Sequence, residues 1–163
     1  MNLSGKAVKE FYEKYEISKE NILIIYDDVN IDLGVLRMRP NGSDGGQNGI
    51  KSVMYEMETD EIPRLRFGIK GGEEFDKQRS DDRFSLADYV LSAFEEAEYE
   101  VLERSVETAK NAVLSFIDNG IADTMNRFNG STAEVNKPEA KPELNPGTQT
   151  DTQPENEREN NTN

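Results

Sequence analysis

A run of five apolar residues, from Ile22 to Tyr26, places the strongest constraint on how this chain can fold. Three of the five are isoleucines, and the run is followed directly by Asp27 and Asp28. A short, continuous run rich in β-branched residues is typical of a strand that is buried on both faces. Because such strands occur mainly in parallel sheets covered by helices, the run predicts an α/β fold.

The rest of the chain alternates between helical and extended patterns, as the α/β class requires. We expect helices at 3–15, 50–57, 95–118 and 121–128, with Ser4 as the N-cap of the first. Strands are expected at 34–39 and 64–69, and a short strand or turn at 86–92. Within 95–118, apolar residues recur every three or four positions, which predicts a core-facing stripe: Leu102, Val106, Ala109, Val113 and Phe116.

Composition changes sharply after Asn129. The last segment, 130–163, holds four of the six prolines and only four apolar residues. Such a segment buries too little apolar surface to offset the entropy that it would lose on ordering. We therefore expect one domain at 1–129 and a disordered acidic tail at 130–163.

Charge and missing residue types exclude several classes of function. The chain has no cysteine, which excludes disulfides, zinc fingers and thiol nucleophiles, and no histidine, which excludes an imidazole general base. A net charge of −14 argues against nucleic-acid binding over the whole surface but leaves room for a local basic patch. No apolar run could span a membrane or form the core of a signal peptide, so we expect a cytoplasmic protein.

Three groups of residues could carry chemistry. Asp27 and Asp28 follow the apolar strand, at the carboxyl end where ligands bind in open α/β sheets, although such residues also cap turns. The segment 42–49 has four glycines with Ser43, Gln47 and Asn48, and precedes a helix; it is either a ligand-binding loop or a flexible connection. It lacks the residues of a Walker loop or a dinucleotide fingerprint.

The third group is basic and lies on the two expected strands and beside them. A phosphate-binding patch and a solvated strand face both fit its pattern, because alternate residues of a strand share a face. Its members are Arg37, Arg39, Lys51, Arg64, Arg66 and Lys70.

Taken in order, these segments resemble the bacterial peptidyl-tRNA hydrolase family. The matching segments are MNLSGKAV at 1–8, IIYDD at 24–28, LGVLRMRP at 33–40, GSDGGQNGIKS at 42–52, PRLRFGI at 63–69, DYVLS at 88–92 and MNRFN at 125–129. The resemblance implies a single α/β domain with a mixed, twisted sheet flanked by helices. It also implies a monomeric enzyme without a cofactor or a metal, which hydrolyses the ester between peptide and tRNA and so recycles tRNA in translation.

The resemblance also implies roles for individual residues. Asn2, Gly45 and Asn48 would line the cleft that binds the peptide near the ester, with Gln47 in the same loop. Asp27 matches the carboxylate that orients the family's catalytic histidine. The positions that hold tRNA phosphates in the family match Arg37, Arg39 and Arg66.

Two departures from the family pattern put the activity in doubt. The family's domain begins before its MNLSG motif, and that earlier part supplies a central strand and the catalytic histidine. Its glycine loop reads Gly-Gly-His-Asn-Gly, whereas this chain has Gln47, which cannot take a proton. Ester hydrolysis needs a base, and Asp27 is a poor one unless burial raises its pKa. We therefore expect the chain as given to be inactive and marginally stable.

Two accounts of the chain remain open from its sequence. In the first, it is part of a working peptidyl-tRNA hydrolase whose preceding segment, with the histidine, is missing from the record. In the second, it is a non-catalytic relative that binds RNA or a protein partner. A metal-dependent enzyme built on Asp27 and Asp28 is weaker, because spacing supplies no third ligand.

Overall fold

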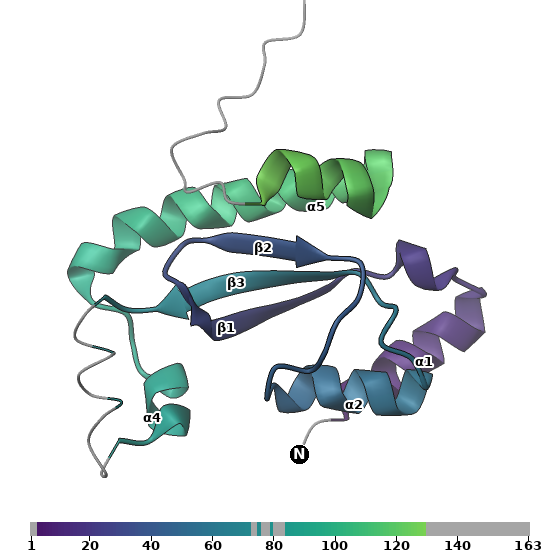
Figure 1. The fold of residues 1–163 in the computed structure, drawn as a ribbon, viewed down its shortest axis with the longest axis horizontal. Helices are drawn as coiled ribbons and strands as arrows, with labels where there is room; N and C mark the ends of the chain where they lie inside the picture. Colours follow the sequence, from purple (N-terminus) through teal and green to yellow (C-terminus); the bar gives the residue numbers. More distant parts are fainter. Residues whose placement is uncertain (1–2, 73–74, 76–78, 80–83, 130–163) are drawn as a thin grey trace, which may run out of the picture.

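The structure, a computed structural model, describes residues 3–72, 75, 79 and 84–129 of the 163-residue chain. At its centre lies a three-stranded sheet with the order β1-β3-β2 (Figure 1). The strands are β1 (Ile24–Asp32), β2 (Leu36–Arg39) and β3 (Arg64–Lys70). β1 runs parallel to β3 and β2 runs antiparallel to it, so the expected mixed sheet is confirmed. The expected tail at 130–163 lies outside the described residues.

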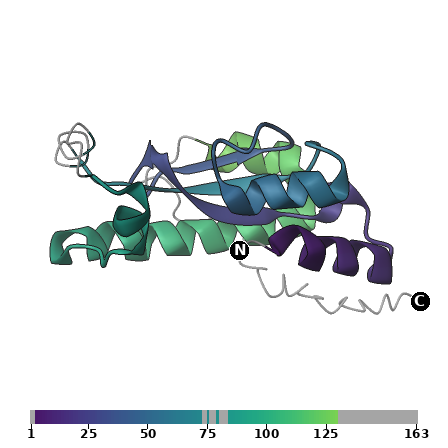
Figure 2. The same ribbon diagram turned by 90° about the horizontal axis from the view of Figure 1, so that it is seen from below.

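Helices cover both faces of this sheet, as Figure 2 shows from below. α1 (Ser4–Tyr15) and α2 (Asn48–Met57) pack together and against β1, where Ile50, Val53, Met57 and Ile62 form one buried cluster. α5 (Tyr99–Phe128) packs against β2 and β3 around a second cluster, which includes Leu36, Met38, Leu65, Ala112 and Phe116. A short α4 (Leu86–Leu91) precedes α5. None of the helices in the described part of the chain is long and apolar enough to cross a membrane.

The apolar run at 22–26 leads into the parallel strand β1, as predicted, but β1 continues through Asp27 and Asp28 to Asp32, so these two residues lie within the strand and not after its end. The strand is also not buried on both faces. Ile24 and Tyr26 pack against the α1–α2 cluster, whereas the side chain of Ile25 is 52% exposed. The reason is position, because β1 pairs with β3 alone and therefore lies at one edge of the described sheet. The opposite edge is covered differently: the side-chain amide of Asn129 accepts a hydrogen bond from the Met38 N–H (2.6 Å) and donates one to the Met38 carbonyl (3.0 Å).

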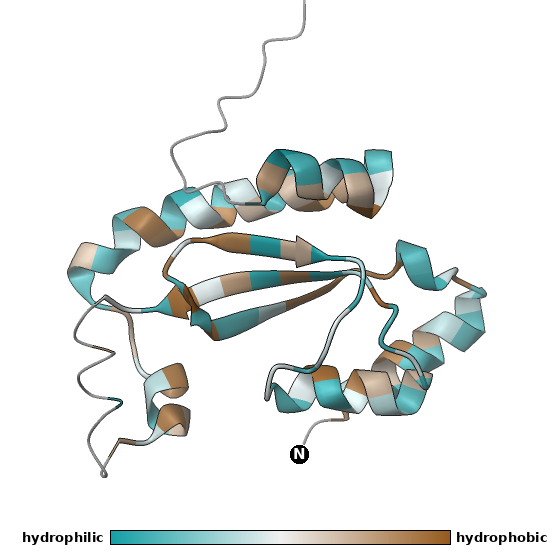
Figure 3. Cartoon of the chain, in the orientation of Figure 1, coloured by the Kyte–Doolittle hydropathy of each residue, from teal (hydrophilic) through white to brown (hydrophobic). Residues whose placement is uncertain are grey.

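The face that α5 buries includes only part of the apolar stripe predicted from its sequence: Phe116 is buried and Ala109 packs against the same cluster. Ser105, Thr108, Ala112 and Ser115 are buried beside Phe116, whereas Val106 of the predicted stripe is 59% exposed. Small side chains allow a close approach: a Cβ on Gly34, before β2, would lie 2.5 Å from Ser105 Oγ. Burial leaves these two hydroxyls hydrogen-bonded, since Ser105 and Thr108 donate to backbone carbonyls one turn earlier in the helix. Apolar and hydrophilic segments therefore alternate along α5 in Figure 3.

Two local predictions also need correction. The short strand or turn expected at 86–92 is the helix α4, which begins after Ser85 because the Ser85 hydroxyl accepts a hydrogen bond from the Asp88 N–H at 3.2 Å. Ser4 does not cap α1, since the N-cap position is Leu3. The two helices expected at 95–118 and 121–128 are confirmed: α5 is broken between them at Gly120, which has a φ of 74°, although its first half begins at Tyr99.

Candidate functional site

The glycine-rich segment forms a loop between β2 and α2, and a buried arginine holds it in place. Arg64 of β3 is 1% exposed. Its guanidinium donates four hydrogen bonds to backbone carbonyls, those of Gly42, Ser43, Asp60 and Ile62. A guanidinium engaged in this way has a structural role, although Arg64 also borders the cavity that Arg39 and Arg66 line.

The end of this loop has a conformation that glycine favours. Gly45 and Gly46 have φ angles of 59° and 84°, and no atom lies within 4 Å of where a Cβ would stand at either residue. The need for glycine here is therefore one of backbone conformation and not of space. Asp44 closes the turn, since its carboxylate accepts from the Gly46 N–H at 2.7 Å and its carbonyl from the Gln47 N–H at 3.0 Å. The turn brings Gln47 to the N-cap position of α2.

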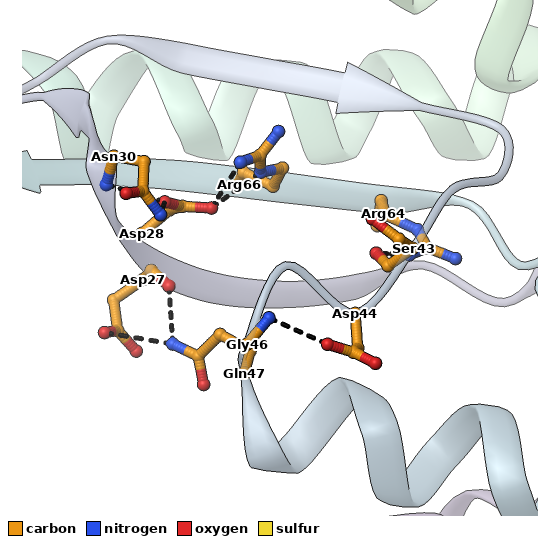
Figure 4. Close-up of polar contacts among 9 residues, drawn as sticks. All are labelled: Asp27, Asp28, Asn30, Ser43, Asp44, Gly46, Gln47, Arg64 and Arg66. Atoms are coloured by element: carbon orange, nitrogen blue, oxygen red, sulfur yellow. Dashed lines mark hydrogen bonds and ion pairs between the residues drawn. The ribbon is translucent and has the colours of Figure 1, made fainter.

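Gln47 meets Asp27 at the carboxyl end of the apolar run (Figure 4). Its side-chain Nε2 donates to the Asp27 carbonyl at 2.8 Å and lies 3.3 Å from the Asp27 carboxylate Oδ2. Two residues predicted from separate motifs, 20 positions apart, thus form one polar contact. An amide in this place can orient a neighbouring group or a substrate, but it cannot accept a proton at neutral pH.

Asp28 points to a different set of partners. Its carboxylate accepts from the Arg66 guanidinium at 2.6 and 2.7 Å on Oδ2, and from the Asn30 backbone N–H at 2.8 Å on Oδ1. Asp27 and Asp28 therefore do not combine into a shared metal site. Over residues 3–72, 75, 79 and 84–129, no group of three or more acidic, histidine or cysteine side chains could hold a metal ion.

The predicted arginines gather on one face of the sheet. Arg66 stands opposite Arg37 of β2 and opposite Tyr26 of β1 in the strand register. Arg66 and Arg39 line a cavity of ≈ 540 Å³ together with Tyr26, Ser43 and Gly45. Arg37 and Arg39 are both exposed. The cavity thus joins the arginine face to the glycine loop, and both arginine side chains and loop backbone N–H groups can hold a phosphate.

The remaining predicted residues are less well placed or not described. Asn48 is the exposed first residue of α2, beside Gln47, and Asn2 lies outside the described residues. Lys70 lies 3.8 Å from the Asp32 carboxylate. Sequence reasoning missed Tyr26 and Asn30. The signal for Tyr26 was its register opposite Arg66, which a sequence does not reveal before the strands are paired.

Known proteins of one family have similar sequences. The family model described as peptidyl-tRNA hydrolase matches residues 1–138. A curated peptidyl-tRNA hydrolase from Clostridium botulinum (strain Alaska E43 / Type E3) is 46% identical over 133 residues, which are 82% of this chain and 64% of that protein. Another peptidyl-tRNA hydrolase from the same species (strain Eklund 17B / Type B) is 43% identical over 133 residues, which again are 82% of this chain and 64% of that protein.

The chain belongs to the peptidyl-tRNA hydrolase family. Its fold agrees with that assignment: the crystal structure of peptidyl-tRNA hydrolase from Acinetobacter baumannii superimposes with a TM-score of 0.68 at 27% identity. That match covers 82% of this chain and 63% of the crystallised one. The chain thus spans somewhat less than two thirds of the length of the curated relatives that it matches. Membership in the peptidyl-tRNA hydrolase family confirms the resemblance drawn from the glycine loop and the strand motifs.

Proposed function

We propose that this chain binds peptidyl-tRNA through the cavity that Arg39 and Arg66 line, with Arg37 beside it. The observation that carries the proposal is the junction of this arginine face with the loop that holds Gln47 against Asp27. Arginine side chains hold phosphates through paired N–H donors, and Asp27 matches the carboxylate that orients the catalytic histidine in the family.

The family reaction, hydrolysis of the ester between peptide and tRNA, needs a group that takes a proton from the attacking water. This chain has neither histidine nor cysteine. In the loop the candidate is Gln47, whose amide has no proton-accepting role and already donates to Asp27. We propose that the 163 residues by themselves bind the substrate and leave its ester intact.

The second candidate function is that of a non-catalytic relative that binds RNA or a protein partner. The contact between Gln47 and Asp27 favours it, because the carboxylate that would orient a histidine is here engaged by an amide. The first candidate function is that of a working peptidyl-tRNA hydrolase. In that enzyme Gln47 would be a tolerated difference, because the general base would come from another part of the protein. The intact mass of the protein in its native cells separates them: a product much heavier than 18.4 kDa that contains a histidine favours the enzyme.

Binding is tested with a triple variant, Arg37→Ala with Arg39→Ala and Arg66→Ala, titrated against deacylated tRNA at several salt concentrations. We expect the affinity to fall and the slope of log K against log salt to decrease by up to about three, close to one per lost phosphate contact. The matched control removes three lysines of α1, Lys6, Lys9 and Lys14, and should leave most of the affinity. Equal losses in the two variants would mean that only overall charge matters.

Catalysis is tested with purified residues 1–163 and peptidyl-tRNA. We expect tRNA binding together with peptide release at the rate of the uncatalysed reaction, because no side chain in the chain is an efficient general base near neutral pH. A full-length curated relative serves as the positive control for the substrate. Release well above background would overturn this prediction and would point to Asp27 as the base.

A further inference from the structure

Asp28 is a buried carboxylate with every oxygen engaged. Its side chain is 4% exposed. Oδ2 accepts from Arg66 Nε at 2.7 Å and from Arg66 Nη2 at 2.6 Å, while Oδ1 accepts from the Asn30 backbone N–H at 2.8 Å and from Asn30 Nδ2 at 3.2 Å. A carboxylate fixed by four hydrogen bonds cannot turn to a substrate or a metal. It can only hold what it already contacts.

Arg66 is held on one side and open on the other. Asp28 occupies its Nε and one hydrogen of Nη2, and among the described residues no further acceptor for its guanidinium is found. The side chain is 28% exposed and borders the cavity that Arg39 and Gly45 also line. In Figure 4 the far end of the guanidinium points away from Asp28, toward β2. The donors that remain are those that would face a ligand in the cavity.

Electrostatic attraction alone does not explain an acidic residue in this position. Arg66 stands opposite Arg37, and Arg39 lies on the same strand as Arg37, so the surface already attracts anions. Asp28 subtracts one charge from it and weakens that attraction. What the carboxylate adds is geometry: an arginine side chain loses rotamer entropy when it is ordered, and Asp28 orders Arg66 before any ligand arrives.

The geometry points to Asp28 as a positioning residue that presets the Arg66 guanidinium for a phosphate group, with Asn30 holding Asp28 in place. This inference rests on the proposed function, since it concerns the same arginine face. It adds a residue that strengthens phosphate binding by holding Arg66, although its negative charge alone would weaken that binding.

The charge of Asp28 and its positioning role therefore predict opposite effects of the same substitution on tRNA affinity. Asp28→Asn raises the net charge by one unit, so attraction alone predicts tighter binding of deacylated tRNA and a steeper salt dependence. We expect the reverse: affinity about three- to tenfold weaker and a salt slope lower by about one, because an unheld Arg66 makes a poorer phosphate contact. The matched control is Asp32→Asn, which removes the same charge from the same strand at a carboxylate that is 80% exposed. It should leave the affinity unchanged or slightly raise it.

Two further measurements separate positioning from a loss of fold. Arg66→Ala and the double variant complete a cycle: once Arg66 is absent, Asp28→Asn should weaken binding no further. In NMR spectra, the Nε–Hε signal of Arg66, assigned from its absence in Arg66→Ala, should be protected from exchange in the parent chain and lost in Asp28→Asn. A merely structural role would move the melting temperature without this pattern.

Each outcome distinguishes the inference from the proposed function. If Arg66→Ala binds tRNA as well as the parent chain does, the proposed function fails at this residue. If Arg66→Ala weakens binding while Asp28→Asn matches Asp32→Asn, only the positioning role is overturned. If Asp28→Asn does not fold, Asn30→Ala decides, because Asn30 is exposed and its loss removes one of the contacts that hold Asp28. Unchanged affinity in Asn30→Ala would then count against the inference.

Discussion

Arg64→Met is expected to lower the free energy of unfolding by at least about 3 kcal/mol, a fall of about 10 °C in melting temperature. Arg64 is 1% exposed, and its guanidinium is the partner of four backbone carbonyls. Methionine fills part of the volume but donates nothing, so the carbonyls of Gly42 and Ser43 lose these bonds. The loop that carries Gln47 should loosen with them. Thermal and urea unfolding followed by circular dichroism measure the effect.

Arg37→Met is the matched control for that substitution. Arg37 lies on the neighbouring strand, and its side chain is exposed. The same exchange there should change stability by no more than about 0.5 kcal/mol, as is usual for surface positions. If the two variants unfold at the same urea concentration, the carbonyl contacts of Arg64 contribute little and the structural role assigned to it is wrong.

Gly5→Ala should destabilise the chain by about 3 kcal/mol, although alanine normally favours helices. Gly5 lies in the first turn of α1, where the helix touches α2. An added Cβ would stand 2.1 Å from the Ser52 carbonyl oxygen and 2.8 Å from Glu56 Cγ. The two helices would have to separate, which would weaken the packing of Val8 and Tyr12 on the α1–α2 cluster. A chemical denaturation curve with an unchanged m-value and a lower midpoint is the expected observation.

Gly49→Ala provides the comparison on the other helix of the pair. Gly49 is the second residue of α2, and the nearest atom to a Cβ built there is Ser4 Oγ at 4.0 Å. With no collision, the substitution should be neutral or stabilising by up to about 1 kcal/mol, because alanine loses less backbone entropy than glycine. Opposite signs for the two variants support close helix packing as the cause, and equal losses would contradict it.

Periodicity predicted most of the framework because local patterns decide element type. The apolar run led correctly to a parallel strand, and the break at Gly120 appears where two helices were expected to meet. Periodicity predicted only part of the buried face of α5, since the choice between Val106 and Ser105 depends on how closely the helix approaches the turn at Gly34. That distance belongs to the tertiary structure and not to the helix.

In the candidate site, too, the sequence predicted which residues matter but not how they contact one another. Arg64 and Arg66 are two residues apart on one strand, and alternation assigns them to the same face with the same exposure. The structure gives them opposite roles, because two of the four carbonyls that engage Arg64 come from the glycine loop, 22 and 21 residues away along the chain. The contact between Gln47 and Asp27 is also long-range. Motif spacing identified both residues and the family, but only the fold shows that they touch.

The side chain of Asn129, bound to both backbone groups of Met38, has a consequence for how copies of this chain can associate. Sheets polymerise into fibres when both of their outer strands accept a neighbour. In this chain the Asn129 amide occupies both backbone groups of Met38, so a second copy cannot add a strand to β2 at that residue.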